Sequence, residues 1–318
     1  MCRNILDALK PLYFQLKIAG FLTFKVNNDT GCFKDNSKYL IVVCVLNSTL
    51  SIVSLIYYMP MIDIYFLANS LSVYLLQTLA IVFAMKIVVT DIFKYINRHK
   101  VLHLWKDIYL IDNVFLIGGV RSNYKIIKYG GSAIIWGQIL LKIIVGRFFP
   151  DKSENFVVKN FILLSLIISN IRSAFISNEF VTLRIVVTYY FNKYFILLQK
   201  INTSATQLNQ SKLLVSLYFH LCKLSRDVDR ITSPQILMNL IESFLSLNFI
   251  LFRVVALVIY VPENEVSLRD IFRLYLIIHY GITLAYIILP GYVCINMVST
   301  LYFNLGNYYL TKFLFQFT

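Results

Sequence analysis

Long apolar runs, broken by shorter polar segments, dominate the hydrophobic pattern of the chain. Crossing a hydrocarbon layer about 30 Å thick takes roughly 20 apolar residues in a helix, because only intrahelical hydrogen bonds satisfy the backbone in lipid. The pattern predicts membrane-spanning helices over 39–59, 64–90, 130–149, 156–188, 235–260, 269–289 and 296–317. A tight turn at Pro60 is expected between the first two, and the last run fits either a seventh span or an incomplete one.

The polar segments between these runs differ in length. The fourth apolar run begins near Phe156 and can continue to Phe191, so its inner end, with Arg184, is expected to project from the membrane as helix. The two long segments, 91–129 and 192–231, are basic, and the second is amphipathic. We therefore expect helical structure in both loops.

Composition identifies lipid as the solvent of most of the chain. Hydrophobic residues make up 58% of the 318, charged residues 14%, and the mean hydropathy is +0.69. A water-soluble domain needs more polar surface than this. The net charge of +14 does not indicate a nucleic-acid partner, because the basic residues fall between apolar runs instead of on one face. The expected fold class is an all-α membrane protein with about seven transmembrane helices and membrane lipid as a partner.

Loop charge predicts the orientation in the membrane. Lys and Arg number six in residues 1–38, seven in 91–129 and six in 192–231. The alternate loops hold none in 60–63, one in 150–155 and none in 261–268. By the positive-inside rule the N-terminus and both long loops are cytoplasmic, and seven spans would leave the C-terminus outside. This orientation, expected in the plasma membrane, is the inverse of a G-protein-coupled receptor.

Motifs for enzyme chemistry or metal binding are weak. The sequence contains no GxGxxG, P-loop, GxSxG or HExxH motif, and its five cysteines form no CxxC pair. His99 and His103 stand at i and i+4, and a solvated helix face is favoured for them over a metal site. We expect no catalysis, no metal and no cofactor.

One stretch carries a family resemblance. The sequence His220-Leu-Cys-Lys-Leu-Ser-Arg-Asp-Val-Asp-Arg-Ile-Thr-Ser-Pro-Gln-Ile-Leu237 resembles the segment leading into the fifth helix of insect gustatory receptors. The Leu-Lys-Ile-Ala-Gly-Phe block at 16–21, the cytoplasmic N-terminus and the two long loops agree with it. The last helix of that family carries Thr-Tyr, five apolar residues and Gln-Phe. Gln316 and Phe317 match the final pair, but Thr-Tyr is missing, as expected of an atypical member or of a truncated, non-conducting isoform.

The resemblance implies a function. Gustatory receptors of this type are ligand-gated, non-selective cation channels, tetramers in which the last helix of each subunit lines a shared pore. It implies that this chain detects a soluble tastant, a bitter or plant compound by default, as part of a homo- or heterotetramer with other chemoreceptor subunits. Gln316 best matches the pore motif of the family.

Polar and aromatic residues in the outer halves of the predicted spans are candidates for ligand binding. Such groups cost free energy in lipid unless they face a partner or a wet cavity. An aromatic pocket with a few polar anchors is typical of small-molecule sites. The candidates are Tyr65, Asn69, Trp136, Asn170, Tyr275 and His279. Each residue also fits a plainer role, as an interhelical hydrogen bond or an interfacial anchor.

Ionisable residues inside the predicted spans leave a second question open. They are Arg172, Glu179, Glu242 and Arg253. A proton or ion pathway and internal ion pairing both explain them, and we favour pairing. A secondary transporter would need a functional acid such as Glu179 or Glu242, and a receptor coupled to G proteins would need the opposite orientation.

Overall fold

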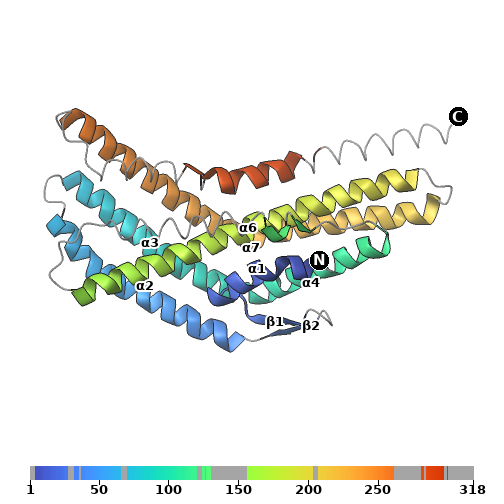
Figure 1. Cartoon of the computed structure of the whole chain (residues 1–318), viewed down its shortest axis with the longest axis horizontal. Coiled ribbons are helices and arrows are strands. Elements are labelled where there is room, and N and C mark those ends of the chain that lie inside the picture. The colour runs from blue at the N-terminus through green and yellow to red at the C-terminus, as the bar shows by residue number, and fades with distance from the viewer. Residues whose placement is uncertain are drawn as a thin grey trace.

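The computed structural model is built almost wholly of helices (Figure 1). It describes residues 4–27, 32–35, 37–65, 70–119, 124–125, 127–129, 156–202, 207–260, 281–282, 284–296 and 299. The elements are α1 (Ile5–Ile18), β1 (Phe24–Asn27), β2 (Cys32–Asp35), α2 (Ser37–Tyr65), α3 (Ser70–Ile96), α4 (Arg98–Ile117), α6 (Phe156–Asn202) and α7 (Gln207–Tyr260), followed by helical residues Leu284–Asn296. The predicted all-α class is confirmed, with the small β1–β2 hairpin as an addition.

Helices α6 and α7 are the longest elements and lie side by side (Figure 1). Their 47 and 54 residues correspond to about 70 and 80 Å at 1.5 Å per residue, more than twice a hydrocarbon layer. α6 begins at Phe156 and continues past Phe191. The two polar segments are largely helical, because α4 occupies most of the first and α7 begins at Gln207 within the second.

The prediction of a tight turn at Pro60 is wrong. Helix α2 continues through Pro60 and ends at Tyr65. A proline inside a helix costs about 3 kcal/mol. In apolar surroundings a break in the helix costs more, because it leaves several backbone groups without hydrogen bonds at several kcal/mol each. The helix therefore persists through Pro60.

Helices α2 and α3 reverse the pattern of a water-soluble protein. On α2, Ile41, Val42 and Leu46 are exposed while Asn47 is buried. On α3, Met85 is exposed and its neighbour Lys86 is buried. Apolar side chains that face outward around a polar interior fit lipid as the surrounding medium.

The predicted spans are only partly covered by the described residues. Within these residues, one helical stretch, Leu213–Phe252, has the length and composition needed to cross a membrane, and Ile41–Leu50 and Leu284–Asn296 are shorter apolar helices. The predicted span 130–149 lies outside the described residues, as do residues 269–280 and most of 296–317. The boundaries of the membrane crossings stay predictions.

Helix α1 packs into the core and ends in a tight cap. Its leucines, Leu9 and Leu16 among them, are fully buried. The Phe21 N–H donates to the Leu16 carbonyl at 2.8 Å and the Gly20 N–H to the Lys17 carbonyl at 3.1 Å, the two bonds of a Schellman cap. Gly20 has φ +76°, a left-handed conformation that glycine adopts without strain.

Gly20→Ala tests how closely α1 and α2 approach each other. A Cβ at Gly20 would overlap Cγ1 of Val43 and lie 2.7 Å from its Cβ. The left-handed backbone costs alanine about 1–2 kcal/mol and overpacking adds about 1–3 kcal/mol. Gly119, at φ +67°, is the matched control, because a Cβ there meets nothing within 4 Å. Thermal unfolding in detergent should show a loss of stability that is larger for Gly20→Ala than for Gly119→Ala by about 1–3 kcal/mol, and equal losses would contradict the close approach.

Candidate functional site

Three buried charges on one helix form the centre of the candidate site. Lys86, Asp91 and Lys94 of α3 have exposed fractions of 2%, 2% and 1%. Each forms an ion pair with a residue more than 80 positions away, in the pairs Lys86–Glu242, Asp91–Arg172 and Lys94–Glu179. We call these three pairs the α3 charge ladder. It joins α3 to α6 twice and to α7 once.

The middle pair also connects to α2. Arg172 donates to both carboxylate oxygens of Asp91, one of them at 3.3 Å. The Ser48 hydroxyl of α2 donates to the same carboxylate at 3.2 Å. A two-pronged guanidinium–carboxylate contact fixes geometry better than a single bond. Asp91 therefore holds α2, α3 and α6 together.

A polar chain extends the Lys86 pair across α6 to α7. The Lys86 ammonium donates to the Ser173 hydroxyl at 3.0 Å, and this hydroxyl donates to the Asn239 amide oxygen at 3.2 Å. The Asn239 amide nitrogen donates to the Ser177 hydroxyl at 3.2 Å. The polar groups that form these hydrogen bonds all have partners, as the low-dielectric interior requires.

The Phe21 ring contacts two cations of the α3 charge ladder. Its ring centroid is 4.8 Å from the Arg172 guanidinium and 5.6 Å from the Lys94 ammonium. Cations over an aromatic face are held by the ring quadrupole. The residue after the α1 cap thus contacts the ends of two different ion pairs.

A second charge cluster lies farther along α6. The Lys193 ammonium is 3.3 Å from a carboxylate oxygen of Asp112 on α4. Asp112 also accepts from the Tyr124 hydroxyl at 2.7 Å and from the Ile5 N–H at 3.2 Å. Four aromatic rings, Phe115, Tyr124, Tyr189 and Tyr190, surround the ammonium at 4.8 to 5.9 Å from their centroids. Burial lowers the pKa of Lys193, and the Asp112 carboxylate partly offsets this effect.

The stretch that carries the family resemblance contributes to the α6–α7 contact. Arg184 of α6 forms an ion pair with Asp229 and donates to the Ser225 hydroxyl at 3.1 Å. On the other side of α7, Lys223 and Arg226 are exposed. Part of this stretch therefore has a packing role within one subunit.

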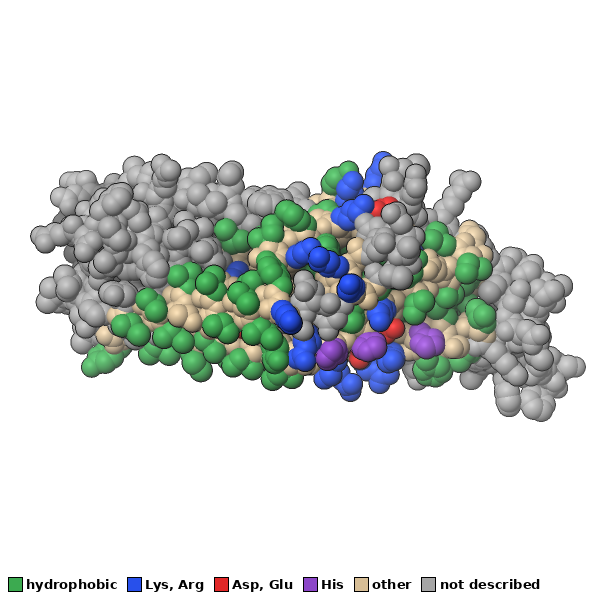
Figure 2. All heavy atoms as spheres, turned by 90° about the horizontal axis from the view of Figure 1, so that it is seen from below, with side chains coloured by type: hydrophobic (Ala, Val, Ile, Leu, Met, Phe, Trp, Pro, Cys, Tyr) green, Lys and Arg blue, Asp and Glu red, His purple; other side chains and the backbone are tan. Residues whose placement is uncertain are grey.

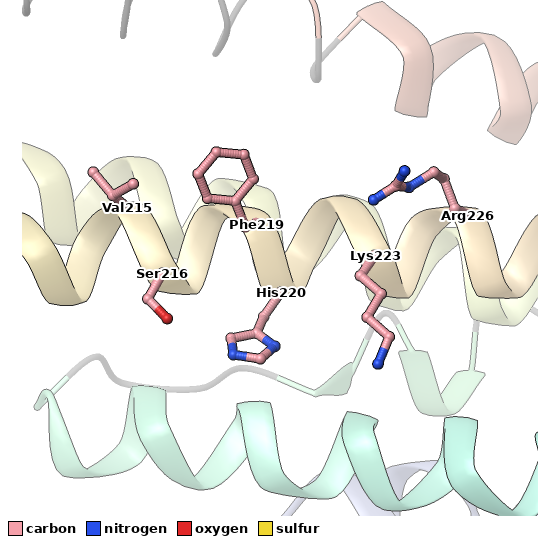
Figure 3. A pocket seen from close by; sticks show the side chains of 6 residues that line it. All are labelled: Val215, Ser216, Phe219, His220, Lys223 and Arg226. Atoms are coloured by element: carbon pink, nitrogen blue, oxygen red, sulfur yellow. The ribbon is translucent and has the colours of Figure 1, made fainter.

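An open depression of about 550 Å³ follows the surface of α7. Figure 3 shows that its six labelled side chains come from one helix and point to two sides of it. Ser216, His220 and Lys223 point toward α4, whereas Phe219 and Arg226 point away (Figure 3). The described residues do not enclose this depression, so it differs from the concave apolar pocket typical of a small-molecule site.

The ionisable residues of the predicted spans form internal ion pairs. This expectation is confirmed for Arg172, Glu179 and Glu242, while the side chain of Arg253 lies outside the described set. Asp91, Asp112 and Lys193 are further partners that the apolar pattern does not indicate. Asp91 and Lys94 follow the apolar run that ends at Thr90 and so fall in a predicted loop, although α3 continues to Ile96.

The predicted ligand and pore residues lie outside the side chains that the structure describes. Tyr65 and Asn170 belong to α2 and α6, but their side chains are not among those described. Asn69, Trp136, Tyr275, His279 and Gln316 lie outside the described residues altogether. The ligand site and the pore therefore stay predictions. His99 and His103 are exposed on α4, and histidines lie among basic side chains on one face of the molecule (Figure 2).

Comparison with known families decides the class of this helical protein. A family model described as 7tm chemosensory receptor matches residues 9–302, nearly the whole chain. The chain belongs to the 7tm chemosensory receptor family. No curated protein matches it. The resemblance found in the sequence is thereby confirmed at the level of the family, and the seven-helix fold with it.

The family gives the receptor its broad function. It is a membrane chemoreceptor that responds to a small-molecule ligand. Chemosensory receptors of this family are generally not enzymes. In this receptor the charged residues of the described core have internal partners, which fits a structural role for them better than a chemical one.

Proposed function

We propose that this receptor is a gustatory subunit of a ligand-gated, non-selective cation channel that opens on binding a soluble tastant, by default a bitter or plant compound. The observation that carries the proposal is the chemosensory family match over residues 9–302. The N-terminus is cytoplasmic and the receptor acts in the plasma membrane as a homo- or heterotetramer with other chemoreceptor subunits. Gln316 contributes to the pore.

The α3 charge ladder favours a channel over a secondary transporter. A transporter that couples to protons or cations needs a membrane acid whose charge changes during the cycle. Glu179 and Glu242, the acids suited to that role, are each paired with a buried lysine. Separating such a pair costs about 3–5 kcal/mol. A transport cycle that changed the charge of either acid would meet this free-energy cost in each turnover.

Agonist-evoked current tests the proposal. The full chain is expressed in a heterologous cell, its surface level is measured, and a panel of soluble tastants and volatile odorants is applied. The expected result is a fast inward current with single-channel steps, carried by both Na⁺ and K⁺ and evoked by a tastant. Cells that do not express the receptor and cells that express a Lys94→Glu variant are the controls.

Three results would contradict the proposal in different ways. Saturable uptake that depends on an ion gradient, without single-channel steps, indicates a transporter. A response abolished by blocking G proteins indicates metabotropic signalling. Responses to volatile compounds alone leave the channel intact but replace the tastant by an odorant.

His279→Phe tests the proposed ligand site. This site comprises Tyr65, Asn69, Trp136, Asn170, Tyr275 and His279. If the imidazole forms one hydrogen bond with the ligand, its loss should raise the half-maximal ligand concentration about 5- to 10-fold, the equivalent of about 1 kcal/mol. His220→Phe is the matched control, because His220 is exposed on α7. Equal dose–response curves for the two variants would exclude His279 from the site.

A further inference from the structure

The β1–β2 hairpin places two lysines directly opposite each other. Lys25 and Lys34 are cross-strand partners in the antiparallel register, and both are exposed. The neighbouring pair, Val26 and Phe33, packs against the core. Like charges directly opposite each other destabilise a β ladder. Among the described residues neither lysine forms an ion pair with an acid.

This hairpin lies at the boundary between apolar and basic surface. Lys38 is exposed in the first turn of α2, and the exposed apolar residues Tyr39, Ile41 and Val42 follow at once. From Lys38 to Val42 the helix rises about 6 Å. This rise matches the thickness of one headgroup layer, about 5–8 Å. Figure 2 shows the hydrophobic surface giving way to a band of Lys and Arg side chains.

The end of α3 reaches the same boundary. Ser48 of α2 contacts Asp91 of α3, and Cys44 contacts the Asp91 backbone. Lys100 belongs to α4, which begins at Arg98 directly after α3 ends at Ile96. Lys100 is exposed and follows the exposed Ile96. Apolar surface thus gives way to exposed basic residues both at the start of α2 and at the junction of α3 and α4.

We propose that Lys25, Lys34 and Lys38 form a binding site for the phosphate headgroup of an anionic membrane lipid. A phosphate placed between Lys25 and Lys34 replaces their repulsion by two charge-assisted hydrogen bonds. The acyl chains of the lipid continue along the exposed apolar face of α2. The continuity of charged and apolar surface selects a membrane lipid over a free phosphate, because only the lipid contacts both. The proposed lipid site requires that the chain is inserted in a membrane, but it does not require that the chain conducts ions.

Lipid-dependent stability tests the site. The full chain is placed in nanodiscs of phosphatidylcholine alone or mixed with phosphatidylserine, and thermal unfolding and lipid retention are measured. Lys25→Gln/Lys34→Gln should weaken retention of phosphatidylserine by about 30-fold. The matched control, Lys223→Gln/Arg226→Gln, removes two exposed charges from α7 and should retain the lipid.

The sign of the stability change separates a lipid site from a merely structural hairpin. In phosphatidylcholine alone the Lys25→Gln/Lys34→Gln variant should unfold at the same or a higher temperature than the natural chain, because the cross-strand repulsion is gone. In phosphatidylserine the order should reverse. Equal loss of lipid in both double variants, no loss in either, or full protection by soluble glycerophosphoserine would overturn the proposal.

Discussion

Lys193→Met should lower the free energy of unfolding by about 3–5 kcal/mol, because it leaves the Asp112 carboxylate buried without its cation. The Asp112 side chain is 0% exposed. The Tyr124 hydroxyl and the Ile5 N–H still donate to it, but neither neutralises its charge. Methionine fills much of the lysine volume, so the loss measures charge more than packing. Denaturant unfolding in detergent gives the value.

Removing the second charge should recover much of this loss. In Lys193→Met/Asp112→Asn, the asparagine oxygen still accepts from Tyr124 and Ile5, and no buried charge remains. The double variant should therefore be more stable than Lys193→Met alone, with a coupling energy of about 1–3 kcal/mol. Strictly additive losses would mean that the ion pair contributes nothing beyond the packing of its two side chains.

The sequence predicted the kind of helix better than the partners inside it. A helix over the apolar run 39–59 could be expected, because length and apolar content are readable along the sequence. The pairing of Glu242 could be expected in kind, since a lone charge in lipid is costly. Its partner, Lys86, lies 156 residues away, and spacing along one chain does not indicate such contacts.

The hairpin was missed because its stability is not local. Its two strands have four residues each, and two facing strands alone are marginal in water. Phe24 holds the hairpin through its ring contacts with Trp105 of α4 and through its carbonyl, which accepts from the Tyr13 hydroxyl at 3.0 Å. These contacts join α1, β1 and α4, which periodicity treats as separate elements.

Reversing one charge of the α3 charge ladder should prevent folding, and reversing both should restore it. Lys94→Glu places a second carboxylate beside Glu179, where both side chains are 1% exposed. The cost exceeds the about 3–5 kcal/mol of losing one partner, because repulsion is added to the unpaired charge. No receptor should then reach the cell surface. Lys223→Glu, an exposed position on α7, serves as the control and should leave surface expression unchanged.

The double reversal Lys94→Glu/Glu179→Lys keeps both charges and should recover surface expression, but not the full unfolding temperature. The shortfall has a specific cause, because the Lys94 ammonium lies over the Phe21 ring and a carboxylate there meets the negative face of the aromatic system. Phe21→Leu should therefore destabilise the natural chain more than it destabilises the Lys94→Glu/Glu179→Lys variant. If the two backgrounds respond equally to Phe21→Leu, the aromatic ring acts only through packing, and the ion pair alone ties α3 to α6 at this level.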